Sequence, residues 1–396
     1  MTDAIVVSSI SVLPLYLTAG LAVQISAELD LSLSALGASS AAFFGAQALF
    51  SPLTGALVDR LGVKVAMRCS TFLVATLLLL AGLLVRSFSS LLVVLVIAGL
   101  GNAVAQPATN QFVAERIVAR RQGVAYGAKQ SAIPTASLLA GLAVPVLGIT
   151  LGWRWTFGTF ALIVALLGLR APGGRKGASR PVIVPVSDNE LSKSLQTLMA
   201  FTSGIAAACG TSMGVYLVSA AVATGWSAGA AGVLFAAASL VGILCRFTAG
   251  WQADRFQFDH LTTIACMMLL GAAGCVAMMS DSKPLFIVGA LAAFGLGWGW
   301  PGLFIYAVVM LNPARPAAAT AFTQVGTAIG AVAGPLLFGL WIQHHSFAGG
   351  WAFVGAGLVV SAVLLFLVGV KIKNSARSTT ECVGENDVEV DRPQDK

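Results

Sequence analysis

The sequence predicts an all-α membrane protein in which twelve transmembrane helices form two six-helix halves. Of the 396 residues, 57% are hydrophobic and only 10% are charged, which leaves too little polar surface to cover a water-soluble domain. Twelve apolar runs are long enough to cross about 30 Å of hydrocarbon as helices. A charged motif that follows the second run returns after the eighth run, which is typical of a chain built from two similar halves.

The apolar runs follow one another with only short polar breaks. The first run starts almost at the N-terminus, without the basic segment or cleavage site of a signal peptide, so we expect a retained helix. The runs cover 4–27, 36–57, 66–86, 90–114, 122–149, 153–170, 197–222, 228–250, 261–280, 284–311, 317–343 and 350–371. The expected domains are therefore an N-terminal bundle at 1–170, a cytoplasmic linker at 171–196, a C-terminal bundle at 197–373 and a disordered acidic tail at 374–396.

The repeated motif is a compact charged turn. It reads G-A-L-V-D-R-L-G-V-K over 55–64 and G-W-Q-A-D-R over 250–255. The first copy resembles the signature G-x-x-x-D-R-x-G-R/K of the major facilitator superfamily of secondary transporters, whereas the second copy lacks the trailing glycine. The resemblance implies two six-helix pseudo-repeat bundles that rock about a central substrate site.

The resemblance also assigns a gating role to the motif. In the superfamily, the carboxylate equivalent to Asp59 holds the cytoplasmic side shut, and it can do so by accepting hydrogen bonds from helix N-terminal amides and from basic side chains. Prolines in the fifth and eleventh runs are further expected hinge positions. The alternative for Arg60 and Lys64 is that they only set the orientation in the membrane. The expected gating residues are Gly55, Asp59, Arg60, Gly62, Lys64, Asp254, Arg255, Pro145 and Pro335.

The distribution of Lys and Arg predicts the orientation. Most basic residues, with Arg246 counted among them, fall on one side of the membrane, and only Arg86, Arg154 and Lys283 fall on the other. We therefore expect both termini in the cytoplasm and the protein in the cell membrane. The net charge of +7 is scattered over short loops, which argues against a nucleic-acid partner. The six cysteines stand singly, so we expect no metal site and no cofactor.

Lys129, in the fifth run, is the most informative single residue. A charge inside the membrane costs on the order of 3 kcal/mol unless it faces water or a partner. We expect Lys129 to face the central cavity, and the alternative is that its side chain extends back to the cytoplasmic interface. No carboxylate lies near it along the run, so a charged Lys129 would find its counter-ion in an anionic substrate.

Further polar residues complete the expected substrate site. On the fourth run, Asn102, Gln106 and Asn110 recur at every fourth position and form one polar stripe, which indicates a water-filled centre rather than lipid. For the remaining candidates, interhelical hydrogen bonding or an aromatic belt at the membrane surface is an equal alternative. These candidates are Gln130, Tyr16, Tyr216, Trp300 and Gln324.

The predicted function is proton-coupled uptake of a small organic anion, carboxylate-like, by alternating access. The segment 121–127 also resembles organic-anion importers of the superfamily. The alternative is proton-coupled efflux of drugs or metabolites, although the first run has no acid near its middle, only Glu28 at its outer end. The proton could travel on the substrate, on Glu115, or not at all. A membrane enzyme would need a catalytic cluster that the sequence lacks. We expect a functional monomer whose partners are the substrate, a proton and the lipid bilayer.

Overall fold

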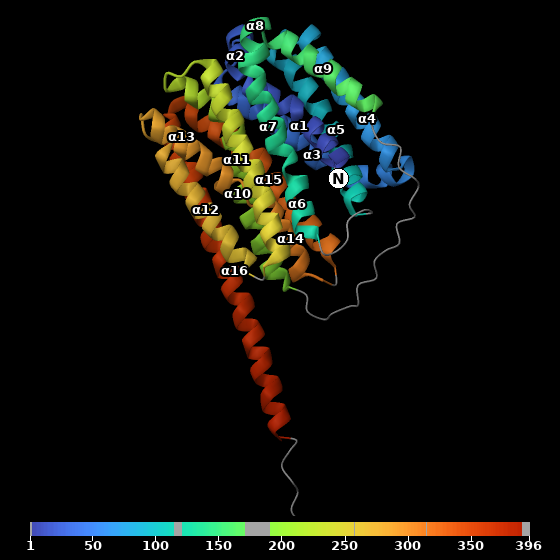
Figure 1. Cartoon of the computed structure of the whole chain (residues 1–396), viewed down its shortest axis with the longest axis vertical. Coiled ribbons are helices and arrows are strands. Elements are labelled where there is room, and N and C mark those ends of the chain that lie inside the picture. Colours follow the sequence, from blue (N-terminus) through green and yellow to red (C-terminus); the bar gives the residue numbers. More distant parts are fainter. Residues whose placement is uncertain (1, 115–120, 171–190, 257, 314, 390–396) are drawn as a thin grey trace, which may run out of the picture.

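The computed structural model describes residues 2–114, 121–170, 191–256, 258–313 and 315–389. Every regular element in these ranges is a helix (Figure 1). Eleven helical segments are long and apolar enough to cross a membrane, and the 17-residue apolar helix Trp153–Leu169 is a shorter twelfth. The prediction of a twelve-helix, all-α membrane protein is confirmed.

Six segments make up the N-terminal half, and two of them are interrupted. The first bends between α1 (Thr2–Gly20) and α2 (Ala22–Leu29). The fifth is divided into α6 (Gln122–Gln130), α7 (Ala132–Ala143), a π-helical turn η2 (Val144–Gly148) and α8 (Ile149–Leu151). The others are α3 (Leu33–Leu61), α4 (Val63–Leu84), α5 (Phe88–Ala114) and α9 (Trp153–Leu169).

The C-terminal half also has six segments, and its fourth is the broken one. That segment comprises α13 (Lys283–Ala292), a π-helical turn η3 (Ala293–Gly297) and α14 (Pro301–Leu311). The others are α10 (Lys193–Ala223), α11 (Ala228–Arg255), α12 (His260–Ala277), α15 (Pro316–His344) and α16 (Phe347–Glu389). Helix α10 starts inside the predicted linker, most of which, at 171–190, lies outside the described residues, so the domain boundaries stay a prediction.

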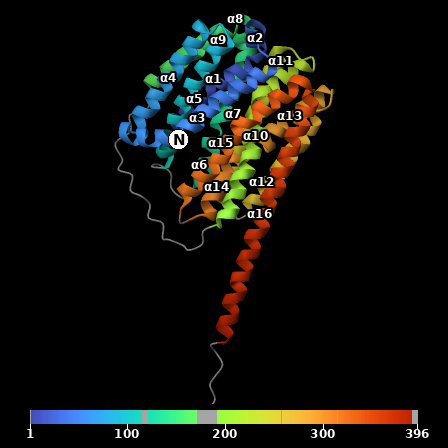
Figure 2. The ribbon, with the colours of Figure 1, turned by 180° about the vertical axis from the view of Figure 1, so that it is seen from behind.

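The C-terminal segment differs from the predicted disordered tail. Helix α16 continues to Glu389 and projects from the bundle (Figure 1). Extending a helix that already exists needs no new nucleus, so a polar sequence can continue it where the same residues alone would not form a helix. Figures 1 and 2 show this extension at one end of the molecule and α2 and α8 at the other. We call the end with residues 55–64 and 250–255 the signature end, and the end with α2 and α8 the opposite end.

The two halves meet along two pairs of segments. Helix α3 packs along α15, and α6 and α7 pack along α11. Glycines make the second contact close, because a Cβ atom added at Gly141 would lie only 2.6 Å from the carbonyl oxygen of Gly232. Small residues of this kind let helix backbones approach each other in lipid, where no hydrophobic force drives helices together.

The glycine that closes the first signature copy has a local structural reason. Gly62 joins α3 to α4 with a φ of 81°, in the left-handed region that other residues rarely adopt. Its N–H donates to the carbonyl of Val58, which ends α3 without leaving that carbonyl unpaired. The turn therefore requires the glycine of the signature whatever role the neighbouring charges play.

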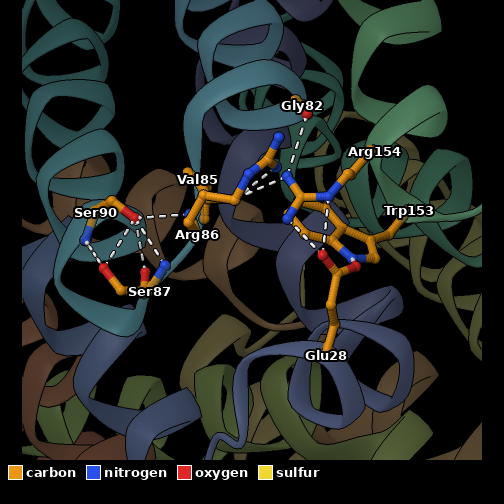
Figure 3. Close-up of polar contacts among 8 residues, drawn as sticks. All are labelled: Glu28, Gly82, Val85, Arg86, Ser87, Ser90, Trp153 and Arg154. Atoms are coloured by element: carbon orange, nitrogen blue, oxygen red, sulfur yellow. Dashed lines mark hydrogen bonds and ion pairs between the residues drawn. The ribbon is translucent and has the colours of Figure 1, made fainter.

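At the opposite end, an ion pair joins three segments of the N-terminal half (Figure 3). Arg154, at the start of α9, donates from Nε and Nη2 to Glu28 Oε1 at 2.9 and 2.5 Å. Its Nη1 donates to the last carbonyls of α4, at 2.8 Å to Val85 and 3.3 Å to Gly82. Trp153 Nε1 donates to Glu28 Oε2 at 2.6 Å. The guanidinium group of Arg154 thus forms an ion pair with Glu28 and caps the C-terminus of α4 at the same time.

The contacts of Glu28 predict that part of the thermal stability of the protein is lost in acid. The hydrogen bond from Arg154 lowers the pKa of the Glu28 carboxyl, and burial opposes the shift only in part. The ion pair therefore contributes fully above the ordinary glutamate pKa of about 4.3 and is lost as the pH falls through the lowered value. Glu28→Gln should lower the melting temperature at pH 7 by about 2 °C or less, because exposed ion pairs contribute at most about 1 kcal/mol.

Thermal unfolding in detergent between pH 7 and about pH 3 checks this expectation. The difference between Glu28→Gln and the unmodified chain should shrink toward zero at the acid end. Asp30→Asn is the matched control, because Asp30 is an exposed carboxylate of the same loop and asparagine tolerates its positive φ of 51°. An Asp30→Asn protein with the same pH-dependent deficit would contradict the assignment to Glu28.

Candidate transport site and the contacts between the halves

Lys129 is buried inside the N-terminal half. Its side chain is 8% exposed, on the short helix α6. The ammonium group donates to Asn110 Oδ1 and, at 3.2 Å, to Gln106 Oε1, both on α5. Among the described residues no carboxylate forms an ion pair with Lys129. The two amide oxygens solvate the positive charge without neutralising it.

The predicted stripe on the fourth segment is part of a longer hydrogen-bonded network. Gln106 Nε2 donates to Asn102 Oδ1 at 3.1 Å, and Ser11 Oγ of α1 donates to the same oxygen at 2.8 Å. Asn102 Nδ2 donates to Gln47 Oε1 of α3 at 2.6 Å. We call this set, Lys129, Asn110, Gln106, Asn102, Ser11 and Gln47, the polar ladder. Its acceptors point toward Lys129, so the amide dipoles stabilise the cation.

The polar ladder becomes more exposed toward the signature end. Asn102 is 1% exposed, Gln106 is half-buried and Asn110 is exposed. On α3, which carries Gln47, the five consecutive residues 49–53 are all exposed, and these cover more than a full helical turn. All sides of α3 are thus exposed over residues 49–53, whereas Thr54 and Val58 farther along the helix are buried.

Of the other predicted residues, Gln130 adjoins the polar ladder, whereas Gln324 and Tyr216 lie apart from it. Gln130 follows Lys129 at the end of α6 and is half-buried. Gln324 is exposed on α15. The hydroxyl of Tyr216 lies 3.0 Å from the carbonyl oxygens of Leu33 and Pro335, where it donates to one of them at a time. Tyr216, on α10, therefore joins the contact between α3 and α15 near the opposite end.

The main residue that the sequence reading misplaced is Arg246. The count of basic residues predicts it on one loop face, but the structure buries it in α11, where it is 2% exposed. Its Nη2 donates to the carbonyl oxygen of Trp298 at 2.5 Å. The sequence held a signal for this placement, because Arg246 lies inside the apolar run 228–250. Tyr16, also fully buried, contacts Trp298 from α1 with ring centroids 6.4 Å apart.

The second signature copy joins the two halves at the signature end. Asp254, near the end of α11, accepts hydrogen bonds from the backbone N–H groups of Gly123 and Val124 at 2.8 and 2.9 Å. These are amides of the first turn of α6, where the helix dipole favours a carboxylate. Close backbone approach supports the contact, because a Cβ at Gly250 would lie 2.5 Å from the carbonyl oxygen of Gly123.

The first signature copy makes no equivalent contact here. Asp59 and Arg60 are exposed, Gly55 and Lys64 are half-buried, and in the described part of the chain Asp59 has no hydrogen-bond or ion-pair partner. Arg255, next to Asp254, is exposed against Trp251 with its Cζ 5.5 Å from the ring centroid. The gating role of the first copy stays a prediction.

The two predicted hinge prolines lie in different local structures. Pro145 lies in the π-helical turn η2, where the helix widens by one residue, as expected for a weakened hydrogen-bond ladder. Pro335 lies inside the unbroken helix α15, and its carbonyl faces Gly37 of α3 so closely that a Cβ on that glycine would be 2.3 Å from the oxygen. Glu115, considered as a proton carrier, lies outside the described residues.

A surface cavity of about 200 Å³ lies away from this region. It is lined by residues of α12, α14 and α16, including Asp259, His260 and Lys373, and by none of the polar ladder. Lys373 pairs with Asp259 at 2.7 Å. We assign the cavity no part in transport.

Helices that enclose buried polar groups, with interrupted segments beside them and close contacts between two halves, are typical of membrane transporters. The model of the Major Facilitator Superfamily matches residues 4–181 and 197–381, and the chain belongs to this family.

Individual relatives are more distant. An "MFS-type efflux pump" from Mycolicibacterium smegmatis is 25% identical over 374 residues, covering 89% of this chain and 86% of the relative. A bacterial homologue of the human lysosomal transporter Spinster, in an inward-facing and occupied conformation, has a TM-score of 0.66 at 15% identity, covering 95% of this chain and 96% of that one. The human organic anion transporter MFSD10 has a TM-score of 0.65 at 15% identity, covering 92% and 99%. These two structures share the fold.

The contact of Asp254 predicts a shift between conformations. Asp254→Asn replaces one carboxylate oxygen by an N–H₂ group that faces a backbone N–H, so the closed contact between α6 and α11 should lose stability. We expect a wider distance distribution between spin labels at Arg121 and Gln252, two surface positions that flank the contact, measured by pulsed electron paramagnetic resonance. Asp281→Asn in the same labelled background is the control and should leave this distribution unchanged, because Asp281 is an exposed carboxylate between α12 and α13. Equal broadening in both variants would contradict the assignment.

Proposed function

We propose that this chain is a secondary transporter that moves a small organic anion of carboxylate type across the cell membrane by alternating access. The observation that carries the proposal is Lys129, a buried cation whose described partners are neutral amide oxygens. A buried charge is costly until an opposite charge pairs with it. An anionic substrate supplies that charge at the point in the cycle where it binds.

The geometry of the polar ladder supports a route to this cation. Asn110 and Gln106 form the more exposed part of the ladder, so an anion that enters from the signature end meets amide groups before it meets Lys129. The closed contact of Tyr216 with Leu33 and Pro335 blocks the opposite end. Release to the other side then requires this contact to open while the signature end closes, which is alternating access.

Uptake coupled to a proton is the direction we propose first. No Asp or Glu belongs to the polar ladder, so in the described part of the site the proton would travel on the substrate rather than on a side chain. We further propose cytoplasmic termini and a functional monomer, since the ladder and both contacts between the halves are formed within one chain.

Efflux of drugs or metabolites is the second candidate, and one observation favours it. The relative from Mycolicibacterium smegmatis, 25% identical over most of the chain, is described as an efflux pump. Right-side-out and inside-out vesicles with an imposed pH gradient distinguish the directions. Uptake predicts accumulation of labelled carboxylate in right-side-out vesicles that are acidic outside, whereas efflux predicts accumulation only in inside-out vesicles that are acidic inside.

The proposed function depends on Lys129 and predicts the effect of replacing it. Lys129→Gln removes the cation, and a charge-assisted hydrogen bond is worth about 1.5–3 kcal/mol, so transport of carboxylates should weaken about tenfold to a hundredfold. Lys129→Arg keeps the charge and should retain part of the activity, because the planar guanidinium fits the amide oxygens differently. Uptake of labelled carboxylates into proteoliposomes measures both.

Lys283→Gln provides the matched control, because Lys283 is an exposed lysine outside the polar ladder. Uptake by that variant should equal uptake by the unmodified chain. If a Lys129→Gln protein that reconstitutes normally transports carboxylates at the normal rate, Lys129 is not the counter-charge and the efflux candidate becomes the better one.

A further inference from the structure

The second buried cation, Arg246, has hydrogen-bonding capacity that the protein leaves unused. Its Nη2 is bonded to the Trp298 carbonyl, but its Nε and Nη1 have no partner among the described residues, and the side chain is 2% exposed. Buried polar groups are nearly always hydrogen-bonded, and an unpaired charged donor is among the most costly exceptions. A buried guanidinium with two free donors therefore indicates a ligand or water that binds there in another state.

A second unpaired group lies beside it. The hydroxyl of Tyr16 is fully buried and has no hydrogen-bond partner. Both side chains contact the same indole, because the Cζ atom of Arg246 lies 5.5 Å from the Trp298 ring centroid and the Tyr16 ring lies 6.4 Å from it. Tyr16 comes from α1 of the N-terminal half and Arg246 from α11 of the C-terminal half. The unpaired donors of both halves thus meet at one indole ring.

The backbone around this ring is interrupted on one side and packs closely on another. Trp298 follows the π-helical turn η3, and residues 298–300 form a break before α14 begins at Pro301. Interrupted backbone within a membrane protein is tolerated where it is buried in protein or lines a binding cavity. On α10, glycine makes room for the two rings, because a Cβ at Gly214 would lie 2.9 Å from Trp298 and 3.0 Å from Tyr16.

The chemistry of these groups selects the ligand. A guanidinium only donates hydrogen bonds, and a tyrosine hydroxyl can add one more donor, so the matching group is an acceptor with negative charge. The indole of Trp298 and the ring of Tyr16 offer apolar faces beside those donors. Resting on the proposed function of anion transport, we propose that Arg246 and Tyr16 bind the carboxylate of the substrate and that Trp298 packs against an aromatic or apolar body attached to it.

This site adjoins the segment that carries Lys129. Gly127, two residues before Lys129 on α6, faces Arg246 so closely that a Cβ there would lie 2.5 Å from the Arg246 carbonyl oxygen. The two cations therefore lie at similar depth on neighbouring segments of opposite halves. Because Tyr16, Trp298 and Arg246 are all buried here, the carboxylate reaches them only when the halves move apart, so its binding is tied to the conformational cycle.

Equilibrium binding to the purified full chain in detergent tests the proposal without transport. Radiolabelled benzoate is the probe, and benzamide, its neutral analogue of the same shape, measures the part of binding that does not need the charge. We expect the unmodified chain to prefer benzoate. Tyr16→Phe should weaken benzoate binding about tenfold and Arg246→Lys about tenfold to a hundredfold, with no change for benzamide.

Controls separate a ligand site from a structural role. Tyr306→Phe changes another partly buried tyrosine, which packs against His260 with ring centroids 5.2 Å apart, and should leave benzoate affinity unchanged. If Arg246 and Tyr16 only stabilise the fold, their variants will melt earlier but keep the normal preference for benzoate over benzamide, and the proposal is wrong. Normal benzoate affinity in both variants would likewise overturn it.

Lys129→Gln, measured in parallel, separates this inference from the proposed function. If the unmodified chain shows no preference for benzoate over benzamide, this carboxylate site is wrong, and carboxylate uptake into proteoliposomes then decides whether anion transport fails with it. If the preference exists and is lost in Lys129→Gln but kept in Arg246→Lys and Tyr16→Phe, anion transport stands and only this inference fails. If the preference for benzoate is lost in Arg246→Lys and Tyr16→Phe, this result supports the carboxylate site whatever Lys129→Gln shows.

Discussion

The arrangement at the centre of this protein depends on a single electrostatic constraint: a positive charge in a low-dielectric interior must be solvated by the protein or paired with an anion. Lys129 meets this constraint in part through the oxygens of Asn110 and Gln106. Arg246 is solvated less well, because its one hydrogen bond among the described residues is to the carbonyl of Trp298, which lies in the break after η3. The polar ladder and the interrupted backbone are thus consequences of keeping cations inside the membrane.

The contacts between the halves follow from a second constraint, which is that helices in lipid associate by close packing and hydrogen bonds. At the signature end, Asp254 binds the first amides of α6 beside Gly123 and Gly250. At the opposite end, Tyr216 bonds to backbone carbonyls beside Gly37. In both places a polar side chain bonds to backbone where glycine lets two helices touch. Each of these two polar contacts depends on one side chain, so it can break without disturbing the packing inside either half.

The two signature copies are alike in sequence but differ in this conformation. The second copy binds a helix N-terminus through Asp254, while Asp59 of the first copy is exposed on a helix whose residues 49–53 are uncovered. The two copies are related by pseudo-symmetry, but in this conformation the second copy contacts the other half through its aspartate and the first copy does not. The unengaged copy follows this exposed stretch of α3 at the signature end.

The sequence by itself determined the fold class, the segments and the main features of the polar stripe. Twelve apolar runs can only form membrane helices, and residues four apart must share a helix face, so the bond between Asn102 and Gln106 could be foreseen. Gly62 could also be recognised, because the turn requires a positive φ whatever surrounds it.

Only the tertiary structure decided which polar residues from different segments meet. Ser11 and Gln47 are each one of several polar residues on an apolar run, and nothing local shows that they point at Asn102. Arg246 was assigned to a loop face because charge counting treats every arginine near a run end alike, whereas its burial depends on the break in the segment that carries Trp298. Side-chain partners across helices depend on how each helix is rotated and tilted, and that is set by the packing of all twelve segments together.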